Sequence, residues 1–582
     1  MRQYWLAMMA VAAVPGFAGA QTIYPIDRAT ILSGSKFDFK VEFPSVVKEA
    51  DVKVLVNGED YEKVLGKKFT LIEKEDGNDV SSIKIDGVAI DKPGSYKIEA
   101  SVGGDKAKSV TWDVYGTAAT PKAKNVIIFI GDGMSVAHRT AARVMSKGNT
   151  EGKANGKLNM DYLPNLAFIG TSSEDSIAAD SANTASAYFT GHKSAVNALG
   201  VYNSRAKDTL GHPKQETLGQ ALRRAAPNKV LGIVSTAELE DATPAALVAN
   251  TRKRSDKDKI VGMHFAVKPE VLLGGGSAYF LPKTTPGSKR KDDIDYIAKF
   301  RDEGYAVATT GEELAKAAAE TNSGKVLGLF HTGNMDTFVD RHYTKGGTVS
   351  KFPNQPGLVD MTKAALDVLS RNEDGFVLMV EGASIDKMSH PLDWDRAVVE
   401  TIEFDKAIGL GREFAEKNPD TLIIVTADHT HGVGFIGTIN DELPGDDMRE
   451  KVGTYQDAGF PNYTDSDGDG FPDKLDVTKR LAIFANNFPD YYETWRPKMD
   501  GPFVPAIKNE KDEYIANEQY KDIPGAVLRI GNLPRSADTG VHAVDDVVLQ
   551  SQGPGSENLK GYMENSDVYR VMVDALALAP QK

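Results

Sequence analysis

The chain has 582 residues, of which 41% are hydrophobic and 26% are charged. This composition is typical of a globular protein with a large core, and it excludes a mainly disordered chain. The formal net charge of -14 argues against specific binding to nucleic-acid backbones. The absence of cysteine excludes disulfides, thiolate zinc sites, cysteine-ligated iron–sulfur clusters and cysteine nucleophiles.

Residues 1–20 have the pattern of a secretory signal peptide. Arg2 precedes a short apolar stretch at 5–13, and Ala18, Gly19 and Ala20 form a small-residue cleavage site. A membrane anchor or a buried helix is the alternative, but the apolar stretch is too short to span a bilayer. We therefore expect no transmembrane anchor and an exported protein, periplasmic or extracellular.

Residues 21–116 are predicted to form an immunoglobulin-like, antiparallel β-sandwich. Polar and apolar residues alternate with period two at 36–43, 52–56, 82–85, 96–99 and 110–114. Asn57-Gly58, Asp86-Gly87 and similar pairs separate these segments, as hairpin turns do. No catalytic cluster lies in this region, and residues 117–124 are interpreted as a linker.

Residues 125–582 have a different pattern, in which short apolar strands alternate with amphipathic helices. Strands are predicted at 126–130, 230–235, 271–273, 325–330, 376–380, 422–426 and 547–551, and helices at 216–226, 294–303, 312–320, 359–372, 394–417 and 566–577. Strands that are apolar on both faces predict an α/β domain with a parallel-rich central sheet and helices on both faces. Residues 433–536, rich in Gly, Pro, Asn, Asp and Tyr, are interpreted as an insertion.

Polar clusters follow four of the predicted strands directly. Strand 126–130 precedes Asp132, strand 376–380 precedes Glu381 and Asp386, and strand 422–426 precedes Asp428 and His429. Strand 230–235 leads in the same way to Asp241 and Thr243.

Such placements indicate a shared metal site. A carboxylate just beyond a buried strand is costly to desolvate unless it is paired or bound to a metal, and the carboxyl ends of parallel strands meet at one edge. Mixed Asp and His sets suit zinc when thiolates are absent, whereas sets with oxygen ligands alone suit magnesium. For any single cluster, a capped turn remains the alternative.

Ser181 lies in a run of small residues that leads into a predicted helix. At a helix N-terminus the backbone N–H groups favour an anion. A serine beside a metal can act as a nucleophile. The alternative is that Asp180 or Ser181 only caps the helix.

These segments resemble the secreted bacterial alkaline phosphatases that use two zinc ions and one magnesium ion. The resemblance rests on IIFIGDGM, ADSANTASAYFTGHK, STAELEDATPAALVA, VLLGGG, VEGASIDKMSH and IVTADHTHG, and it spans residues 125–542 apart from the insertion. It implies an alkaline phosphatase-like fold and hydrolysis of phosphate monoesters.

The resemblance also implies a role for each matching residue. Ser181 would be the nucleophile that becomes phosphoserine, and Arg254 would bind the phosphate, with Arg252 and Lys253 as nearby alternatives. The first zinc would be held by Asp386, His390 and His542, the second by Asp132, Asp428 and His429, and magnesium by Asp132, Thr243 and Glu381. Asp241 and Lys387 would support the magnesium and phosphate sites from behind these ligands.

A second metal motif lies within the insertion, at 465–476. It places acidic residues at loop positions 1, 3, 5, 9 and 12 with Gly at position 6, which is typical of calcium loops. The candidate calcium ligands are Asp465, Asp467, Asp469, Phe471 through its carbonyl group, Asp473 and Asp476. Asp rather than Glu at position 12 weakens the prediction, and an acidic solvated turn is the alternative.

The function predicted from the sequence is that of an alkaline phosphatase acting on phosphate monoesters. Two alternatives stay open: a phosphodiesterase of the same superfold, and a catalytically inactive, calcium-dependent surface protein. Arg254 favours a monoester, because it can pair with the charged oxygen that a diester lacks. The oligomeric state is open at this point, with a homodimer as one option.

Overall fold

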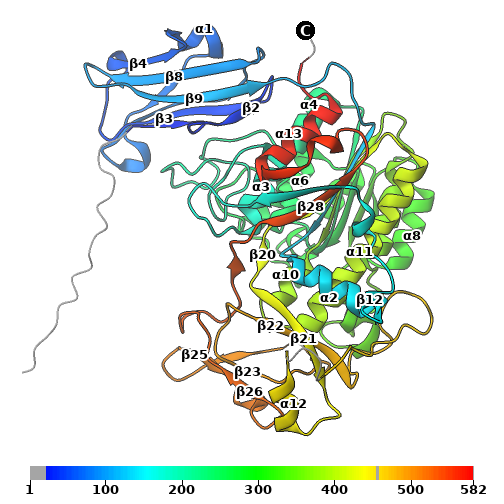
Figure 1. The fold of residues 1–582 in the computed structure, drawn as a ribbon. Helices are drawn as coiled ribbons and strands as arrows, with labels where there is room; N and C mark the ends of the chain where they lie inside the picture. Colours follow the sequence, from blue (N-terminus) through cyan, green and yellow to red (C-terminus); the bar gives the residue numbers. More distant parts are fainter. Residues whose placement is uncertain (1–20, 454–457, 502, 581–582) are drawn as a thin grey trace, which may run out of the picture. The chain divides into compact units, whose positions relative to one another are not determined.

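The computed structural model describes residues 21–453, 458–501 and 503–580, so the predicted signal peptide lies outside the described residues (Figure 1). Within this part of the chain, two compact units are distinguished. One holds the residues up to Tyr115 together with Ser204–Lys214, and the other holds Gly116–Asn203 and the chain from Gln215 onward. Among these residues, no helix is both long and apolar enough to cross a membrane.

The first unit contains two β-sheets that share an apolar core. One has the order β1 (Thr22–Tyr24), β3 (Phe37–Glu42), β7 (Ser82–Val88), β6 (Thr70–Ile72); the other has β2 (Thr30–Leu32), β9 (Lys108–Tyr115), β8 (Gly94–Val102), β4 (Val52–Val56), β5 (Glu59–Asp60). The short helix α1 (Tyr61–Leu65) follows β5. Trp112 is fully buried, with its ring edge-to-face against Phe37 and Phe39.

Two features of this unit differ from the sequence prediction. β2 pairs with β9 in parallel, so the purely antiparallel prediction is wrong for this pair. The segment Ser204–Lys214 also belongs to this unit. Arg205 anchors it there, because its Nε lies 2.7 Å from Glu75 Oε2 and its Nη1 donates to the Phe43 carbonyl group at 2.7 Å.

The second unit is built on a ten-stranded sheet, which confirms the predicted α/β class. Its order is β16 (Ala306–Ala308), β17 (Val326–Leu329), β15 (Val271–Gly275), β14 (Val230–Glu238), β18 (Phe376–Gly382), β10 (Asn125–Gly131), β19 (Thr421–Ala427), β28 (Val547–Gln552), β13 (Asn165–Gly170), β29 (Gly561–Glu564). β28 runs antiparallel to its neighbours β19 and β13. The other pairs are parallel.

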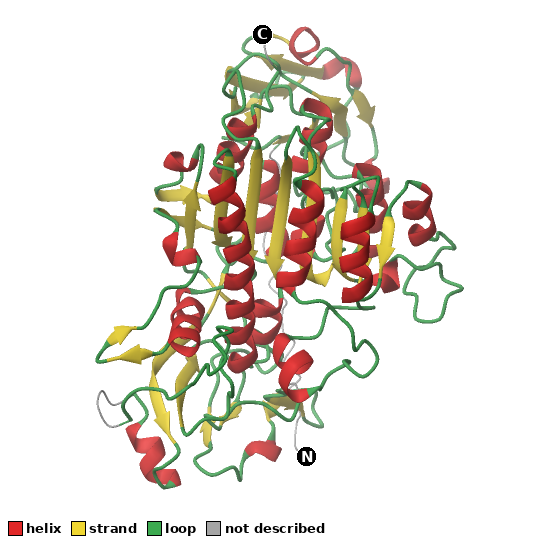
Figure 2. Cartoon of the chain, turned by 90° about the vertical axis from the view of Figure 1, so that its right-hand side faces the viewer, coloured by secondary structure: helices red, strands yellow, loops and turns green. Residues whose placement is uncertain are grey.

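Helices cover this sheet, and Figure 2 shows several of them running alongside its strands. They are α2 (Val136–Lys147), α3 (Ser181–Thr190), α4 (Leu218–Ala225), α5 (Ala242–Ala245), α6 (Lys257–Val267), α7 (Tyr296–Asp302), α8 (Gly311–Glu320), α9 (Leu358–Leu369), α10 (Ser384–Ser389), α11 (Trp394–Lys417) and α13 (Asn565–Leu576). A small hairpin, β11 (Asn149–Thr150) and β12 (Lys153–Ala154), follows α2. The central strands are buried throughout, as their apolar sequences predict.

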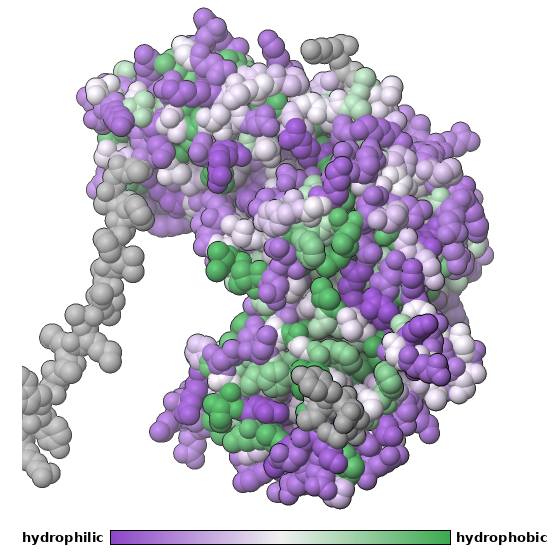
Figure 3. Space-filling view, in the orientation of Figure 1, coloured by the Kyte–Doolittle hydropathy of each residue, from purple (hydrophilic) through white to green (hydrophobic). Residues whose placement is uncertain are grey.

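The segment 433–536 forms short antiparallel pairs instead of continuing the sheet. These are β21 (Val433–Asn440) with β22 (Lys479–Ala485), β23 (Tyr491–Glu493) with β26 (Val527–Arg529), and β24 (Ala506–Lys508) with β25 (Tyr514–Ala516); α12 (Gly445–Lys451) follows β21. Figure 3 shows apolar side chains at the surface of this region. Its exposed apolar residues are Ile436, Phe460, Val504, Ile507, Leu528 and Ile530.

The two ends of the insertion meet in a two-stranded ladder. β20 (Thr430–His431) pairs antiparallel with β27 (His542–Ala543), so that His431 lies opposite His542. In Figure 1, β20 lies between the central sheet and the strands β21 and β22. The insertion therefore leaves and returns beside the polar clusters at the end of the sheet.

Candidate metal centre and nucleophile

Sheet register brings the predicted carboxylates to one place. Ile130 of β10 pairs with Glu381 of β18, and Gly131 pairs with Ala427 of β19. Asp132 directly follows β10 and Asp428 directly follows β19. The two carboxylates therefore lie side by side at the carboxyl ends of adjacent parallel strands. All three acidic side chains are at most 1% exposed.

Asp132, Asp428 and His429 form one compact group of potential ligand atoms. His429 Nε2 lies 3.3 Å from Asp132 Oδ1 and 3.2 Å from Asp428 Oδ2. The Gly133 N–H donates to Asp428 Oδ1 at 2.9 Å and fixes that carboxylate. Burial lowers the pKa of His429, so that its ring is neutral and can offer a lone pair.

Ser181 faces this group from the first turn of α3. Its Oγ lies 3.1 Å from His429 Nε2 and 3.4 Å from Asp132 Oδ1. Asp180 caps the helix by accepting from the Asn183 N–H at 3.0 Å, while Asn183 Oδ1 accepts from the Asp180 N–H at 2.8 Å. Asp180 is thus the cap of the helix, and Ser181 lies beside the carboxylates.

Asp386, His429, His431 and His542 form a second group of potential ligand atoms, and His390 also contacts Asp386. His542 Nε2 and His390 Nε2 each lie 3.4 Å from Asp386 Oδ1. Carbonyl groups hold the other ring nitrogens, Gly540 at 2.7 Å from His390 Nδ1 and Ala179 at 2.7 Å from His542 Nδ1. Such backbone acceptors fix the ring orientation that a metal-binding histidine needs.

The sequence interpretation left His431 out of the ligand sets, yet it contacts Asp386 more closely than the other histidines do. Its Nε2 lies 2.6 Å from Asp386 Oδ1, and Ser135 Oγ donates to its carbonyl oxygen at 3.1 Å. The only signal in the sequence is its spacing of two from His429 on the same extended segment. His431 therefore orients Asp386 and is also a potential ligand beside it.

The pKa shifts follow from this crowding of buried charges. Burial raises the pKa of Asp132, and the carboxylates of Asp386 and Asp428 raise it further. Burial also acts to raise the pKa of Asp386, but hydrogen bonds and charge from His390, together with hydrogen bonds from His431 and His542, hold it well below its usual range. Several buried carboxylates in neighbouring groups are costly unless they bind a proton or pair with a positive charge.

The residues of the predicted magnesium site, Asp132, Thr243 and Glu381, do not appear together in one group of ligand atoms. The Ser235 hydroxyl donates to Glu381 Oε2. Thr243, in α5, is 1% exposed, and its Oγ1 has no hydrogen-bond partner among the described residues. Lys387 Nζ lies 3.0 Å from Asp241 Oδ2 and 4.0 Å from Asp132 Oδ2, so that it links Asp241 to the first group.

Arg254 lies beside Asp180, the residue that precedes Ser181. Its Nη2 donates to Asp241 Oδ1 at 2.7 Å, and its Nη1 lies 3.4 Å from Asp180 Oδ2. Arg252, the sequence alternative, instead donates to Asn203 Oδ1 at 2.7 Å and to the Val196 carbonyl group at 2.9 Å. Lys253 remains without an assigned role at the site.

The calcium-loop residues are only partly brought together. Asp465, Asp467 and Asp469 can present oxygen atoms to one ion. Asp473 accepts hydrogen bonds from Ser466 and Thr464, and the Phe471 ring stacks on Phe338 at 3.9 Å. Asp476 is exposed and does not join the group of three. Calcium binding at 465–476 stays a prediction.

Comparison with known proteins gives a consistent picture. The alkaline phosphatase family matches residues 123–578. Alkaline phosphatase 4 of Bacillus subtilis (strain 168) is 30% identical over 468 residues, which are 78% of this chain and 88% of the relative. The alkaline phosphatase of Escherichia coli (strain K12) is 34% identical over 346 residues, which are 53% of this chain and 70% of the relative.

Solved structures support the fold. The crystal structure of Thermus thermophilus alkaline phosphatase matches with a TM-score of 0.56 at 23% sequence identity. The match covers 80% of this chain and 94% of the Thermus thermophilus chain. The structure of the alkaline phosphatase from the Antarctic bacterium TAB5 matches with a TM-score of 0.51 at 22% sequence identity. This match covers 79% of this chain and 100% of the TAB5 chain. The family match begins at residue 123, beyond the N-terminal β-sheets.

Proposed function

The chain belongs to the alkaline phosphatase family, and from this premise we propose that it hydrolyses phosphate monoesters through a phosphoserine at Ser181. Family and fold establish phosphoester hydrolysis as the class of reaction. The observation that carries the finer proposal is the position of Ser181 Oγ, 3.1 Å from His429 Nε2 at the N-terminus of α3. A nucleophile there meets a phosphate where backbone N–H groups favour negative charge.

The residues present fit two zinc ions and one magnesium ion. Asp132, Asp428 and His429 would hold one zinc, and Asp386, His390 and His542 the other; Asp132, Thr243 and Glu381 would hold magnesium. Two buried oxygen atoms, Asp428 Oδ2 and Thr243 Oγ1, take part in no hydrogen bond among the described residues, as expected of atoms that await an ion. When bound, such ions supply Lewis acidity and lower the pKa of a nearby hydroxyl group or water.

Arg254 would orient the substrate. Its guanidinium presents a planar fork that matches two phosphate oxygens, and Asp180 and Asp241 hold that fork in place. Lys387 adds a second positive charge near Asp132. Nearby Asp241 raises the pKa of Lys387 despite burial, so this charge persists at alkaline pH.

The reaction would take two displacements at phosphorus. Ser181 Oγ forms a bond to phosphorus as the ester P–O bond breaks, and the alcohol leaves with a proton. Water then attacks phosphoserine, the Oγ–P bond breaks, and inorganic phosphate leaves while Ser181 regains its proton. Two in-line steps predict retention of configuration at phosphorus.

The test compares two substrates and one variant. Purified protein supplied with zinc and magnesium should hydrolyse p-nitrophenyl phosphate far faster than bis-p-nitrophenyl phosphate. EDTA should abolish this activity, and Ser181→Ala should nearly abolish it. Faster diester turnover would favour the phosphodiesterase alternative, and no turnover of either ester would favour the non-enzymatic one. Export, calcium binding and a homodimeric state stay separate predictions.

A further inference from the structure

A second cavity lies away from the candidate metal centre, beyond the carboxyl ends of β16 and β17. It has a volume of about 420 Å³ and is bounded by α7, the ends of these two strands and the loop 351–355. None of the proposed metal ligands, nor Ser181 or Arg254, lines it. Open parallel sheets bind ligands beyond their carboxyl ends, and this volume is in the range of small-molecule pockets.

The walls of this cavity are largely apolar. Leu281, Ile297, Val307 and Phe352 line it and are only half-buried in the protein. The ring of His331 lies 4.3 Å from that of Phe352 and continues the aromatic surface. These side chains expose apolar surface that a ligand could remove from water.

The charged side chains that line this cavity are all positive. Arg301 and Lys351 line the cavity, and its lining contains no Asp or Glu. Within the described part of the chain, neither cation forms an ion pair. Two unpaired cations at one cavity stand out in a chain whose net charge is -14.

His331 does not add to this positive charge. Burial lowers its pKa, so the ring is neutral at pH 7. Its Nδ1 accepts from the Gly333 N–H at 2.8 Å, and its Nε2 lies 2.7 Å from Thr348 Oγ1.

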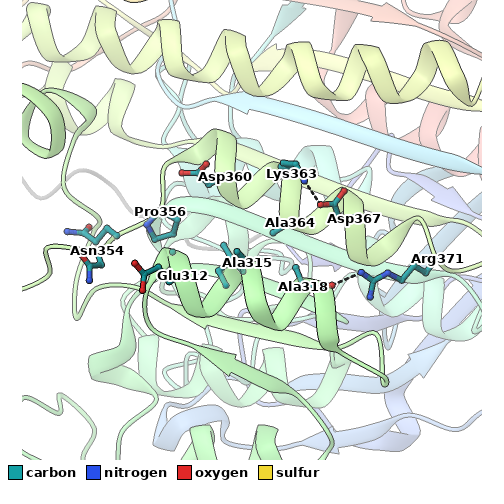
Figure 4. Close-up of a pocket in the computed structure, with 14 residues that line it drawn as sticks. Glu312, Ala315, Ala318, Asn354, Pro356, Asp360, Lys363, Ala364, Asp367 and Arg371 are labelled. Atoms are coloured by element: carbon teal, nitrogen blue, oxygen red, sulfur yellow. Dashed lines mark hydrogen bonds and ion pairs between the residues drawn. The ribbon is translucent and has the colours of Figure 1, made fainter. Parts of the chain in front are cut away.

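The neighbouring groove between α8 and α9 is a useful contrast (Figure 4). It has a volume of about 890 Å³ but mixes acidic and basic side chains. Lys363 Nζ pairs with Asp367 at 2.6 Å, and Arg371 donates to the Ala318 carbonyl group at 2.5 Å. Since both of its cations already have partners, this groove presents no unpaired cation to an anionic ligand.

We propose that the cavity at β16 and β17 binds a small amphipathic anion, an aryl or alkyl carboxylate or sulfonate. Its apolar part would lie against Ile297, Val307 and Phe352, and its charged group would pair with Arg301 and Lys351. This site is independent of the proposed phosphatase reaction.

The probe for this site is 8-anilinonaphthalene-1-sulfonate, an anionic aromatic dye that fluoresces in apolar surroundings. It is titrated into the full-length, metal-supplied protein with excess inorganic phosphate, which excludes dye from the proposed catalytic site. Arg301→Gln combined with Lys351→Gln should weaken the saturable binding about tenfold or more, as loss of charge-assisted hydrogen bonds does. Val307→Phe, which fills the cavity, should weaken it as well.

The matched control is Lys363→Gln combined with Arg371→Gln, which removes two cations from the α8–α9 groove and should leave the affinity unchanged. In the wild-type protein, 1-naphthoate should displace the dye at far lower concentration than the neutral 1-naphthalenemethanol. This competition needs no variant, so it decides even where a substitution unfolds the chain. Equal displacement by both compounds, or full affinity in the variants at Arg301, Lys351 and Val307, would overturn the proposal.

Discussion

Two carboxylates fix the orientation of the Arg254 guanidinium. Its side chain is 24% exposed, and it contacts Asp180 and Asp241 on either side of its guanidinium. Burial acts to lower its pKa, but Asp241 and Asp180 outweigh burial and raise it, so that the charge is permanent. A phosphate bound at Ser181, as proposed, would meet a cation that is already oriented, and little side-chain entropy would be lost on binding.

Arg254→Ala should lower kcat/KM for p-nitrophenyl phosphate by about 10- to 100-fold, the range for lost hydrogen bonds to a charged group. Arg254→Lys should recover only part of the loss, because an ammonium lacks the planar fork. Steady-state kinetics with the monoester and the diester measure both effects. Diester turnover should change far less than monoester turnover.

Arg252→Ala is the matched control for this experiment, since Arg252 binds Asn203 and the Val196 carbonyl group rather than the proposed site. Its kcat/KM should stay near the wild-type value. Similar losses in the Arg252 and Arg254 variants would contradict the assignment of the phosphate to Arg254.

Glu400 gives a prediction about pH and stability. Burial and the neighbouring Glu403 raise its pKa to about 8, while Glu403 itself pairs with Arg341 at 2.8 Å. An acid whose pKa is higher in the folded state binds its proton more tightly there. Its stabilising contribution is thus complete below its unfolded pKa of about 4.5 and is lost as the pH rises to about 8.

Glu400→Gln should therefore raise the Tm relative to the wild type more at about pH 9 than at about pH 5. Each kcal/mol gained corresponds to roughly 2–4 °C in a large domain. Glutamine keeps the oxygen that accepts from the Phe338 N–H, so this contact is preserved. Differential scanning calorimetry of both proteins measures the difference, and a difference independent of pH would refute the assignment.

At the scale of elements, α3 connects fold and chemistry. Ser181 is its first residue, and each residue from Ser181 to Thr190 is buried. Asp180 serves this helix twice, as the cap and as a partner of Arg254. The same carboxylate therefore fixes the helix terminus that presents the nucleophile and the side chain that would bind its substrate.

Asp180→Ala should destabilise the protein by about 1 kcal/mol, the usual cost of a lost N-cap, and should also lower kcat. Asp180→Asn keeps the cap, so its stability should be close to that of the wild type, whereas its kcat should remain below the wild-type value. Thr310→Ala removes the comparable cap of α8, where Thr310 accepts from the Glu313 N–H. That variant should lose stability but not kcat, so equal kcat losses at both caps would reject a specific role for α3.

Much of the fold could be predicted because its signals are local. The apolar strands β10, β18 and β19 and the long helix α11 stand out in the sequence, and contiguous motifs place Asp132, Asp386 and Asp428 beside them. The parallel pairing of β2 with β9 could not be predicted, since it depends on contacts between distant segments. The same holds for Ser204–Lys214, which joins the first unit through Arg205 and its partners.

The candidate site was less completely predictable than the strands that carry it. The contact of His431 with Asp386 joins residues that lie 45 positions apart in the sequence. In the calcium motif, the spacing of acidic residues does not reveal that Asp473 is engaged by Ser466 and Thr464. Hydrogen bonds between side chains of this kind leave no periodic trace in a sequence.

At the scale of the whole molecule, the buried carboxylates of the candidate site repel one another and so affect the stability of the fold. Asp132, Asp386 and Asp428 are each at most 2% exposed. Asp132 and Asp428 belong to one group of potential ligand atoms and Asp386 to a second, and His429 belongs to both groups. Buried like charges are costly without an intervening cation. We therefore expect metal binding and folding to be coupled, in a chain that has no disulfides to stabilise it.

Chelation with EDTA should lower the Tm, and zinc should restore it. The gain is about 2.7 kcal/mol when free metal is 100 times its Kd. Ser181→Ala should show the same response, because Ser181 is not among the proposed ligands. Asp428→Asn should show a smaller one. Calorimetric scans with and without EDTA give the comparison, and identical Tm values would show that the acidic cluster holds no metal.

The most direct test of the central claim is to look for phosphate on Ser181. The metal-supplied protein is mixed with p-nitrophenyl phosphate, quenched in acid and analysed by peptide mass spectrometry. The account predicts a phosphorylated peptide that contains Ser181 in the wild-type protein and no such peptide in Ser181→Ala. The phosphate on Ser181 should remain attached after the acid quench. Rapid turnover without any phosphorylated Ser181 would contradict it and would indicate direct attack of water on the substrate.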